Sequence, residues 1–298
     1  MKSLLLLSIC SLLTSFAIQS DQSPHYFHQT PPGIVPKVFA PGIISLEDEY
    51  EFGSVFNAAG TEFYYGVNVG GKEQIRYSIF VEGEWTAPKT LMEQDQYGSN
   101  DPFLSPDENR LYFISQRPKR GQTEENDYDI WYLERRGEEW SEPINAGPAI
   151  NTDRNEYYIS FTENTTMYFS SNKGAPEDRK WDDFDIYSSD FVDGEFQEAV
   201  RLGNTVNTEE YEADVFVAPD ESYLIFCANR AGGYGQGDLY ISFKQTDGSW
   251  SQSENMGDAI NTRGHELCPF VTMDGKYLFY TSNQDIYWVS TEIFKTDE

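Results

Sequence analysis

The chain has 298 residues, of which 15% are aromatic, and its 50 acidic and 21 basic side chains give a formal net charge of −29. This balance argues against a nucleic-acid partner, because phosphate binding needs clustered Lys and Arg. It suits a soluble surface, a cationic partner or bound divalent cations. The 20 Tyr and 20 Phe favour strands over helices.

Residues 1–17 are expected to be a secretory signal peptide: a basic Lys2, an apolar run over 4–13 and the small-x-small site at 15–17. Export to the periplasm or the medium follows. Cys10 hints at a lipid-anchor site, but the bulky Ile9 before it makes a lipoprotein the less favoured reading. No later apolar run is long enough to span a bilayer. Residues 18–35 read as a flexible lead without a core of their own.

The rest of the chain repeats itself. An Asn-Thr stretch recurs after 56 and then 54 residues, at Asn151, Asn207 and Asn261. Between the copies lie four short strand-like segments, separated by turns such as Ser105-Pro106-Asp107. A period above fifty residues with four strands per unit indicates blades of a propeller, since one such unit cannot bury both of its faces alone.

The repeat units fall at about 49–96, 97–154, 155–210, 211–264 and 265–298, and the last unit stops after its third strand. Residues 36–44 resemble the fourth-strand segment 143–150 and can supply the missing strand. The predicted fold is therefore an all-β, five-bladed propeller of four-stranded antiparallel blades over residues 36–298. The N-terminal strand completes the last blade and removes the open sheet edges.

The repeated elements resemble the WD40-like PD40 repeat of TolB-type propellers. The resemblance is carried by Ser105-Pro106-Asp107, Leu111-Tyr112-Phe113-Ile114-Ser115 and Asp129-Ile130-Trp131, and by their counterparts in the next blades. It departs at 57–60 and 162–165, where other turns replace Pro-Asp. The resemblance implies an exported binding or scaffolding module. Members are usually six-bladed, whereas this repeat count gives five.

Aligning the innermost strands places carboxylates in two columns. Glu51, Ser99, Glu156, Glu212 and Glu266 form the first column, and Asp101 and Asp214 align two positions later. The functional interpretation is a cation site, with Ca²⁺ as the possible ion, or a polar pocket for a sugar or a peptide amine. The structural interpretation is that each Glu binds amides or an Asn/Thr of its own blade. Repetition with the fold favours the structural interpretation for the glutamates.

The loops between second and third strands, at 116–128, 172–184 and 229–237, differ from blade to blade. They are expected on the same face as the blade-to-blade links, which we call the top face. Variable loops on a rigid scaffold commonly carry binding. Trp181 and Tyr234 are candidates to stack on a sugar ring or to anchor a peptide, and the alternative is that they cap a blade edge. The Asp column that opens the third strands (Asp129, Asp185, Asp238 and Asp285) is expected to fix these loops within each blade.

Two cysteines remain after the signal, Cys227 and Cys268, on neighbouring repeats. We favour two buried core residues over a disulfide, although export would permit one. Enzyme motifs are absent from the sequence, and His265 is the one histidine within 36–298. Glycosidase chemistry by the channel glutamates Glu156, Glu212 and Glu266 remains an alternative.

The sequence thus predicts an exported, monomeric, non-catalytic module that binds a cell-envelope protein or glycan through its top face. Its predicted ligand-binding residues are Glu51, Asp101, Glu156, Glu212, Asp214, Glu266, Trp181 and Tyr234. No cofactor other than Ca²⁺ is expected. The alternative function is a glycoside hydrolase or lyase.

Overall fold

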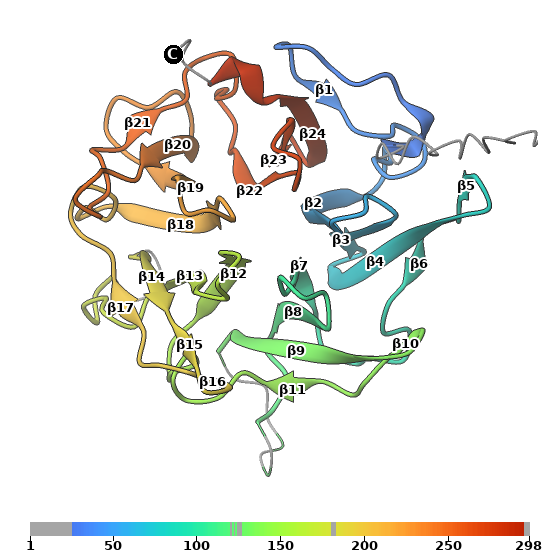
Figure 1. Cartoon of the computed structure of the whole chain (residues 1–298), viewed down its shortest axis with the longest axis horizontal. Helices are drawn as coiled ribbons and strands as arrows, with labels where there is room; N and C mark the ends of the chain where they lie inside the picture. The colour runs from blue at the N-terminus through green and yellow to red at the C-terminus, as the bar shows by residue number, and fades with distance from the viewer. Residues whose placement is uncertain (1–25, 120, 122, 124–126, 180–182, 295–298) are drawn as a thin grey trace, which may run out of the picture.

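The computed structural model describes residues 26–119, 121, 123, 127–179 and 183–294. The predicted signal peptide, residues 1–17, lies outside this part of the chain. The described residues form five antiparallel sheets arranged radially around one axis, with two short 3₁₀ helices, η1 (Tyr26–His28) and η2 (Thr291–Ile293). In Figure 1 the innermost strands of the five sheets surround the centre of the ring. The predicted five-bladed propeller is confirmed.

In the first four blades the strands follow one another outward in chain order, and the last blade takes its outer strand from the start of the chain. The strands of the first three blades are β2 (Tyr50–Phe56), β3 (Glu62–Val69), β4 (Lys72–Val81), β5 (Glu84–Trp85) and β6 (Lys89–Thr90); β7 (Asn100–Leu104), β8 (Arg110–Ser115), β9 (Asp129–Arg136), β10 (Glu139–Trp140) and β11 (Ile144–Asn145); and β12 (Glu156–Phe161), β13 (Met167–Ser171), β14 (Asp185–Ser189) and β17 (Val200–Arg201), with a side hairpin of β15 (Phe191–Val192) and β16 (Glu195–Phe196). The strands of the last two blades are β18 (Tyr211–Val217), β19 (Tyr223–Asn229), β20 (Asp238–Phe243) and β21 (Glu254–Asn255); and β22 (Leu267–Val271), β23 (Tyr277–Ser282) and β24 (Asp285–Ser290), completed by β1 (Lys37–Val38).

The ring closes as the repeat pattern predicts. β1 pairs antiparallel with β24, with Lys37 opposite Trp288 and Val38 opposite Tyr287. Figure 1 shows this junction where the blue start of the described chain meets its red end. Because the outer strand of the last blade comes from the other end of the chain, the ring cannot open without breaking this pairing.

The lead before β1 is packed in part. Tyr26 and Phe27 are buried, and Phe27 stacks on Trp85 with ring centroids 4.3 Å apart. Tyr26 contacts Phe56 of the first blade and Trp288 of the last blade. Residues 18–35 were expected to be flexible and unpacked, and from residue 26 onward this expectation does not hold. The physical reason is that the junction between the first and last blades offers an aromatic surface to cover.

The recurrent Asn-Thr stretches form the links between blades. Asn151, Asn207 and Asn261 are buried, and each side chain bonds both the N–H and the C=O of the second residue of the preceding third strand, at 2.8–3.0 Å. The contact gives each of these N–H groups a partner, whereas each C=O also accepts a backbone N–H, from Ala146, Leu202 or Met256, at 2.9–3.0 Å. No helix in the described part of the chain has the length and apolar character that a membrane span requires.

Candidate functional site

The glutamate column anchors the links. Glu51, Glu156, Glu212 and Glu266 are fully buried. In the last three, one carboxylate oxygen accepts from the backbone N–H of the Thr four residues earlier, at 2.8–3.1 Å, and the other accepts from its hydroxyl, at 2.6–2.7 Å. Glu51 accepts from the Leu46 N–H at 3.2 Å. These bonds agree with the structural interpretation, except that each Thr lies in the link before the blade and not in the blade itself.

The Asp column behaves in the same way. Asp129, Asp185 and Asp238 are bound by side chains of their own blades, namely Asn145, Arg201 and Asn255. Asp238 also accepts from the backbone N–H groups of Tyr234 and Gly235, so it holds the variable loop of the fourth blade. Asp129 forms an ion pair with Lys119 of its own loop. The prediction that this column fixes the loops is therefore confirmed for Asp129 and Asp238, whereas Asp185 binds the fourth strand through Arg201.

Two positions after the glutamates, every innermost strand has a bulge. The bulged residues are Gly53, Asp101, Tyr158, Asp214 and Cys268, and all five have positive φ, between 43° and 53°. Successive strand residues point to opposite faces, so this position would otherwise share the glutamate's direction, away from the channel. A bulge re-aims the side chain. Four of the five residues are not glycine, which is uncommon in the left-handed region and typical of functional sites.

The bulges help to enclose a cavity of about 290 Å³ at the top end of the channel. Three groups of residues form its wall. The first group flanks the column positions 51, 99, 156, 212 and 266: Tyr50, Phe52, Asn100, Tyr157, Tyr211, His265 and Leu267. The second group is the bulged Asp101, Asp214 and Cys268, and the third comes from the second and third strands or the loops that join them: Asn68, Glu73, Ile114 and Tyr128. None of the four column glutamates lines it. The structure therefore separates the predicted carboxylates into a buried structural set and the cavity pair Asp101 and Asp214.

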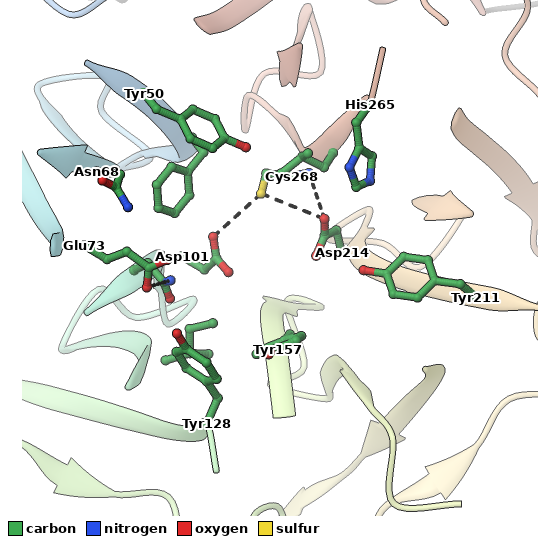
Figure 2. Close-up of a pocket in the computed structure, with 14 residues that line it drawn as sticks. Tyr50, Asn68, Glu73, Asp101, Tyr128, Tyr157, Tyr211, Asp214, His265 and Cys268 are labelled. Atoms are coloured by element: carbon green, nitrogen blue, oxygen red, sulfur yellow. Dashed lines mark hydrogen bonds between the residues drawn. The ribbon is translucent and has the colours of Figure 1, made fainter. Parts of the chain in front are cut away.

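Asp101 and Asp214 face each other across the Cys268 thiol, as Figure 2 shows. The Cys268 Sγ atom lies 3.6 Å from Asp101 Oδ1 and 4.0 Å from Asp214 Oδ2. Each aspartate is only 8% exposed, and neither forms an ion pair with a Lys or Arg of the described chain. Gly53 lies beneath Asp101: a Cβ on Gly53 would be 2.6 Å from Asp101 Oδ1. The glycine leaves room for the carboxylate.

The two aspartates differ in their surroundings. Burial raises the pKa of Asp101 well above its usual range, and the charges of Asp214 and Glu73 raise it further. Burial also raises the pKa of Asp214, to about 6, but His265 and the Cys268 N–H oppose this effect. The two carboxyl groups are therefore held in unequal environments. Both shifts favour the neutral carboxyl more than in a solvent-exposed aspartate.

Tyrosines form much of the cavity wall. Tyr50, Tyr157 and Tyr211 come from three different innermost strands, and Figure 2 shows them around the two aspartates. Burial is the main cause that raises the pKa of each of these phenols above its usual range, so they stay neutral at physiological pH. They supply flat aromatic surface with a hydroxyl at the edge, as in sites that bind sugars or cations.

Further along the strands, side chains fill the channel. The Tyr158 hydroxyl donates to the Pro269 carbonyl oxygen at 2.8 Å, which joins the third blade to the fifth. Beyond it, Phe103, Phe161, Phe216 and Phe270 pack with neighbouring ring centroids 6.0–6.2 Å apart. A separate cavity of about 190 Å³ lies at that end and shares no wall residue with the first. The top cavity is thus bounded below by a layer of aromatic rings.

The predicted rim residues have different outcomes. Tyr234 is 48% exposed and does not line the cavity. Trp181 lies outside the described residues. Cys227 and Cys268 are both free and buried, as favoured from the sequence. Cys227 contacts the Nε2 atom of His265 at 3.4 Å, so a wall residue of the cavity rests on this thiol.

Sequence reasoning missed most of the cavity wall. The sequence interpretation does not include the tyrosines, Asn100, Glu73 or Cys268, although seven of the wall positions flank the column directly. The signal that could have found them is the alternation of the innermost strands. If the glutamate side chains point into the blade, the residues on either side of them point toward the channel.

Comparisons with known proteins agree with the fold. No protein-family model and no curated protein sequence matches the chain. Among solved structures, TolB from Acinetobacter baumannii is similar over 84% of this chain and 56% of its own length, at 14% identity and a TM-score of 0.53. A thermostable family-43 glycoside hydrolase is similar over 83% of this chain and 90% of its own, at 11% identity and a TM-score of 0.53. The TolB protein of Agrobacterium tumefaciens follows with 16% identity, 78% and 69% coverage and a TM-score of 0.49. The chain spans little more than half of the first TolB, and at these identities the likeness shows a shared propeller fold, which binding proteins and hydrolases both use.

Proposed function

We propose that the chain is an exported, non-catalytic module that binds a cell-envelope protein or glycan through its top face, with the axial cavity as the specific contact. One observation carries the proposal. The column that repeats in sequence is used to hold the blades together, whereas the bulged column varies from blade to blade and encloses a cavity. Ligand recognition needs different groups at different points, so it breaks the symmetry that a structural device keeps.

The chemistry of the wall supports binding. Flat tyrosine rings and a few convergent polar groups around a concave space are typical of small-ligand sites. The volume of about 290 Å³ is at the low end for such sites, so one monosaccharide or one side chain fits better than a long chain. Tyr234, in the variable loop of the fourth blade, is exposed and available to a larger partner. Export rests on the predicted signal peptide at residues 1–17.

A glycoside hydrolase or lyase is the second candidate, and one observation favours it. Asp101 and Asp214 are buried in the same cavity with unequal surroundings, and acid–base catalysis on a glycosidic bond uses two carboxyl groups in different protonation states. This moves the enzymatic alternative from the buried glutamates to the aspartate pair. The two candidates share a site and differ in turnover.

A single glycan array with a parallel turnover assay separates the candidates. We expect wild-type protein to bind a subset of glycans or envelope peptides without releasing reducing ends or unsaturated products. The Asp101→Asn, Asp214→Asn double variant should lose that binding, while Asp247→Asn, an exposed charge far from the cavity, should retain it. Asparagine tolerates the left-handed conformation of both aspartates, so the double variant should fold. Turnover that disappears in the double variant would establish the enzyme instead, and binding that the double variant leaves unchanged would place the site elsewhere.

A further inference from the structure

Three acceptor side chains of the cavity wall receive few or weak hydrogen bonds. Asn100 donates its amide N–H to Glu73 Oε2 at 2.6 Å, which leaves the buried Asn100 Oδ1 without a donor from the described chain. The Asp101 carboxylate has the Cys268 thiol as its one donor among the described residues, and a thiol is a weak donor. Asp214 accepts from the Cys268 N–H at a long 3.4 Å. Three acceptor side chains, each more than nine-tenths buried, thus lack strong donors.

Resting on the function proposed above, we propose that the cavity recognises an organic cation with N–H donors, a primary ammonium or a guanidinium group. Such a group supplies three or more donors and a positive charge, which are what Asp101, Asp214 and Asn100 lack. Buried carboxylates are costly unless they are paired, so the ligand would complete the site. The shared chemistry covers a lysine or arginine side chain and an amino sugar.

The tyrosine wall suits the same ligand. A cation over the face of an aromatic ring is attracted by the ring quadrupole, by about 0.5–1 kcal/mol when exposed and about 2 kcal/mol or more when desolvated. Tyr50, Tyr157 and Tyr211 present this surface beside the carboxylates. The net charge of −29 would also draw a cation toward the protein.

A hard metal ion fits the cavity less well. Ca²⁺ takes six to eight oxygen ligands. Within the described residues, no three His, Cys, Asp or Glu side chains are placed to hold a metal together. The side chain that contacts both aspartates is a thiol, which is a soft ligand. Ca²⁺, predicted from the sequence, is therefore the competing ligand in the test.

Isothermal titration of the full chain at pH 7.5 tests the assignment with matched probes. The cations are Nα-acetyl-lysine methylamide, Nα-acetyl-arginine methylamide and glucosamine. Their neutral counterparts are the Nε-acetylated lysine derivative, the citrulline derivative and N-acetylglucosamine. We expect at least one cation to bind tenfold or more tightly than its neutral counterpart, and the preferred pair identifies the source as peptide or sugar. Titration in two buffers of different ionisation enthalpy should show proton release, because the cation favours the ionised form of Asp101.

Asp101→Asn and Asp214→Asn should each weaken cation binding at least tenfold and reduce the proton release, with thermal melts to verify folding. Asp247→Asn removes the same unit of charge from an exposed turn and should leave binding within twofold. Equal binding of cation and neutral probe, stronger binding of Ca²⁺ than of any cation, or unaltered binding by Asp101→Asn would overturn the assignment. If the cations fail while the double variant still abolishes glycan or peptide capture, the binding function stands and only the ligand class falls.

Discussion

Asn207 offers a direct test of the links that hold the blades in register. Its Oδ1 atom accepts from the Ile186 N–H at 2.8 Å, and its Nδ2 atom donates to the carbonyl oxygens of Ile186, at 2.9 Å, and Leu202, at 3.0 Å. The side chain is fully buried. Replacing it by alanine removes all three bonds and admits no obvious substitute donor or acceptor.

The expected cost follows from the backbone groups left behind. Each lost hydrogen bond is worth about 1 kcal/mol net, and each buried group left unsatisfied costs about 1–3 kcal/mol. The Ile186 N–H would lose its partner, whereas the Ile186 C=O would keep the bond that it accepts from the Leu202 N–H at 2.9 Å. We therefore expect Asn207→Ala to lower the free energy of unfolding by about 2–4 kcal/mol. That is a large share of the roughly 5–15 kcal/mol that stabilises a typical domain.

Urea denaturation followed by tryptophan fluorescence and far-UV circular dichroism measures this loss. Asn204→Ala is the matched control, since Asn204 lies in the same link but is exposed and makes only a 3.4 Å contact with Arg201. The control should change stability by less than about 0.5 kcal/mol. A loss below about 1 kcal/mol for Asn207→Ala would show that the link does not depend on this side chain, and the structural account of the repeated stretch would fail.

Two further predictions concern the cavity. Gly53→Ala should displace the Asp101 carboxylate, because the new Cβ would lie 2.6 Å from Oδ1, and it should weaken cation binding at least tenfold. Gly70→Ala is the control: Gly70 also has a positive φ, but a Cβ there meets no atom within 4 Å, so cation binding should be unaltered. Equal cation binding by both variants would contradict the close approach of Gly53 to Asp101. The second prediction concerns pH. The pKa of Asp214 is about 6 in the folded protein and 3.8 for a free side chain, so the folded state binds the carboxyl proton more tightly than the unfolded state. The stabilisation that comes from this proton is therefore complete below about pH 4 and is lost as the pH rises through 6. Urea titrations at pH 4.5 and 7.5 measure the free energy of unfolding of Asp214→Asn and of the wild type. The free energy of unfolding of the variant should rise by about 1–3 kcal/mol relative to that of the wild type from pH 4.5 to pH 7.5. If the difference between the two proteins does not vary with pH, the burial of this carboxyl is contradicted.

The architecture could be predicted because the sequence repeats once per blade. The Asn-Thr links and the apolar second strands recur at nearly constant spacing, and the unit that stops short at residue 298 has its missing strand at 36–44. The pairing of Lys37 with Trp288 shows that this match in sequence reflects a shared structural position. The free cysteines and the within-blade role of Asp129, Asp185 and Asp238 were also predicted, since burial and local bonding need no distant information.

The cavity could be predicted only in part, because it depends on a backbone conformation that the sequence does not announce. Asp101 and Asp214 were aligned with the glutamates, but nothing in the residue types Gly, Asp, Tyr, Asp and Cys indicates a shared left-handed bulge. Without the bulge, strand alternation would turn these side chains away from the channel. Glu73 enters from the third strand of the first blade, which is a tertiary fact. The packing of Tyr26 was missed for the same reason, since its partners come from both ends of the ring.

The two columns explain how a strained site can persist in this fold. A non-glycine residue in the left-handed region costs about 1–3 kcal/mol of stability. This cost applies to each of four bulges, at Asp101, Tyr158, Asp214 and Cys268. Two residues before three of these four bulges, a buried glutamate is bonded to the link behind it, which fixes the strand at the point where the bulge begins. The exception is Asp101, whose strand has Ser99 at that position. The glutamate side chains point into the blades, whereas the bulged side chains point into the channel. The cavity residues can therefore differ from blade to blade without weakening the contacts between blades. A symmetric scaffold of this kind can hold an asymmetric set of ligand-binding groups.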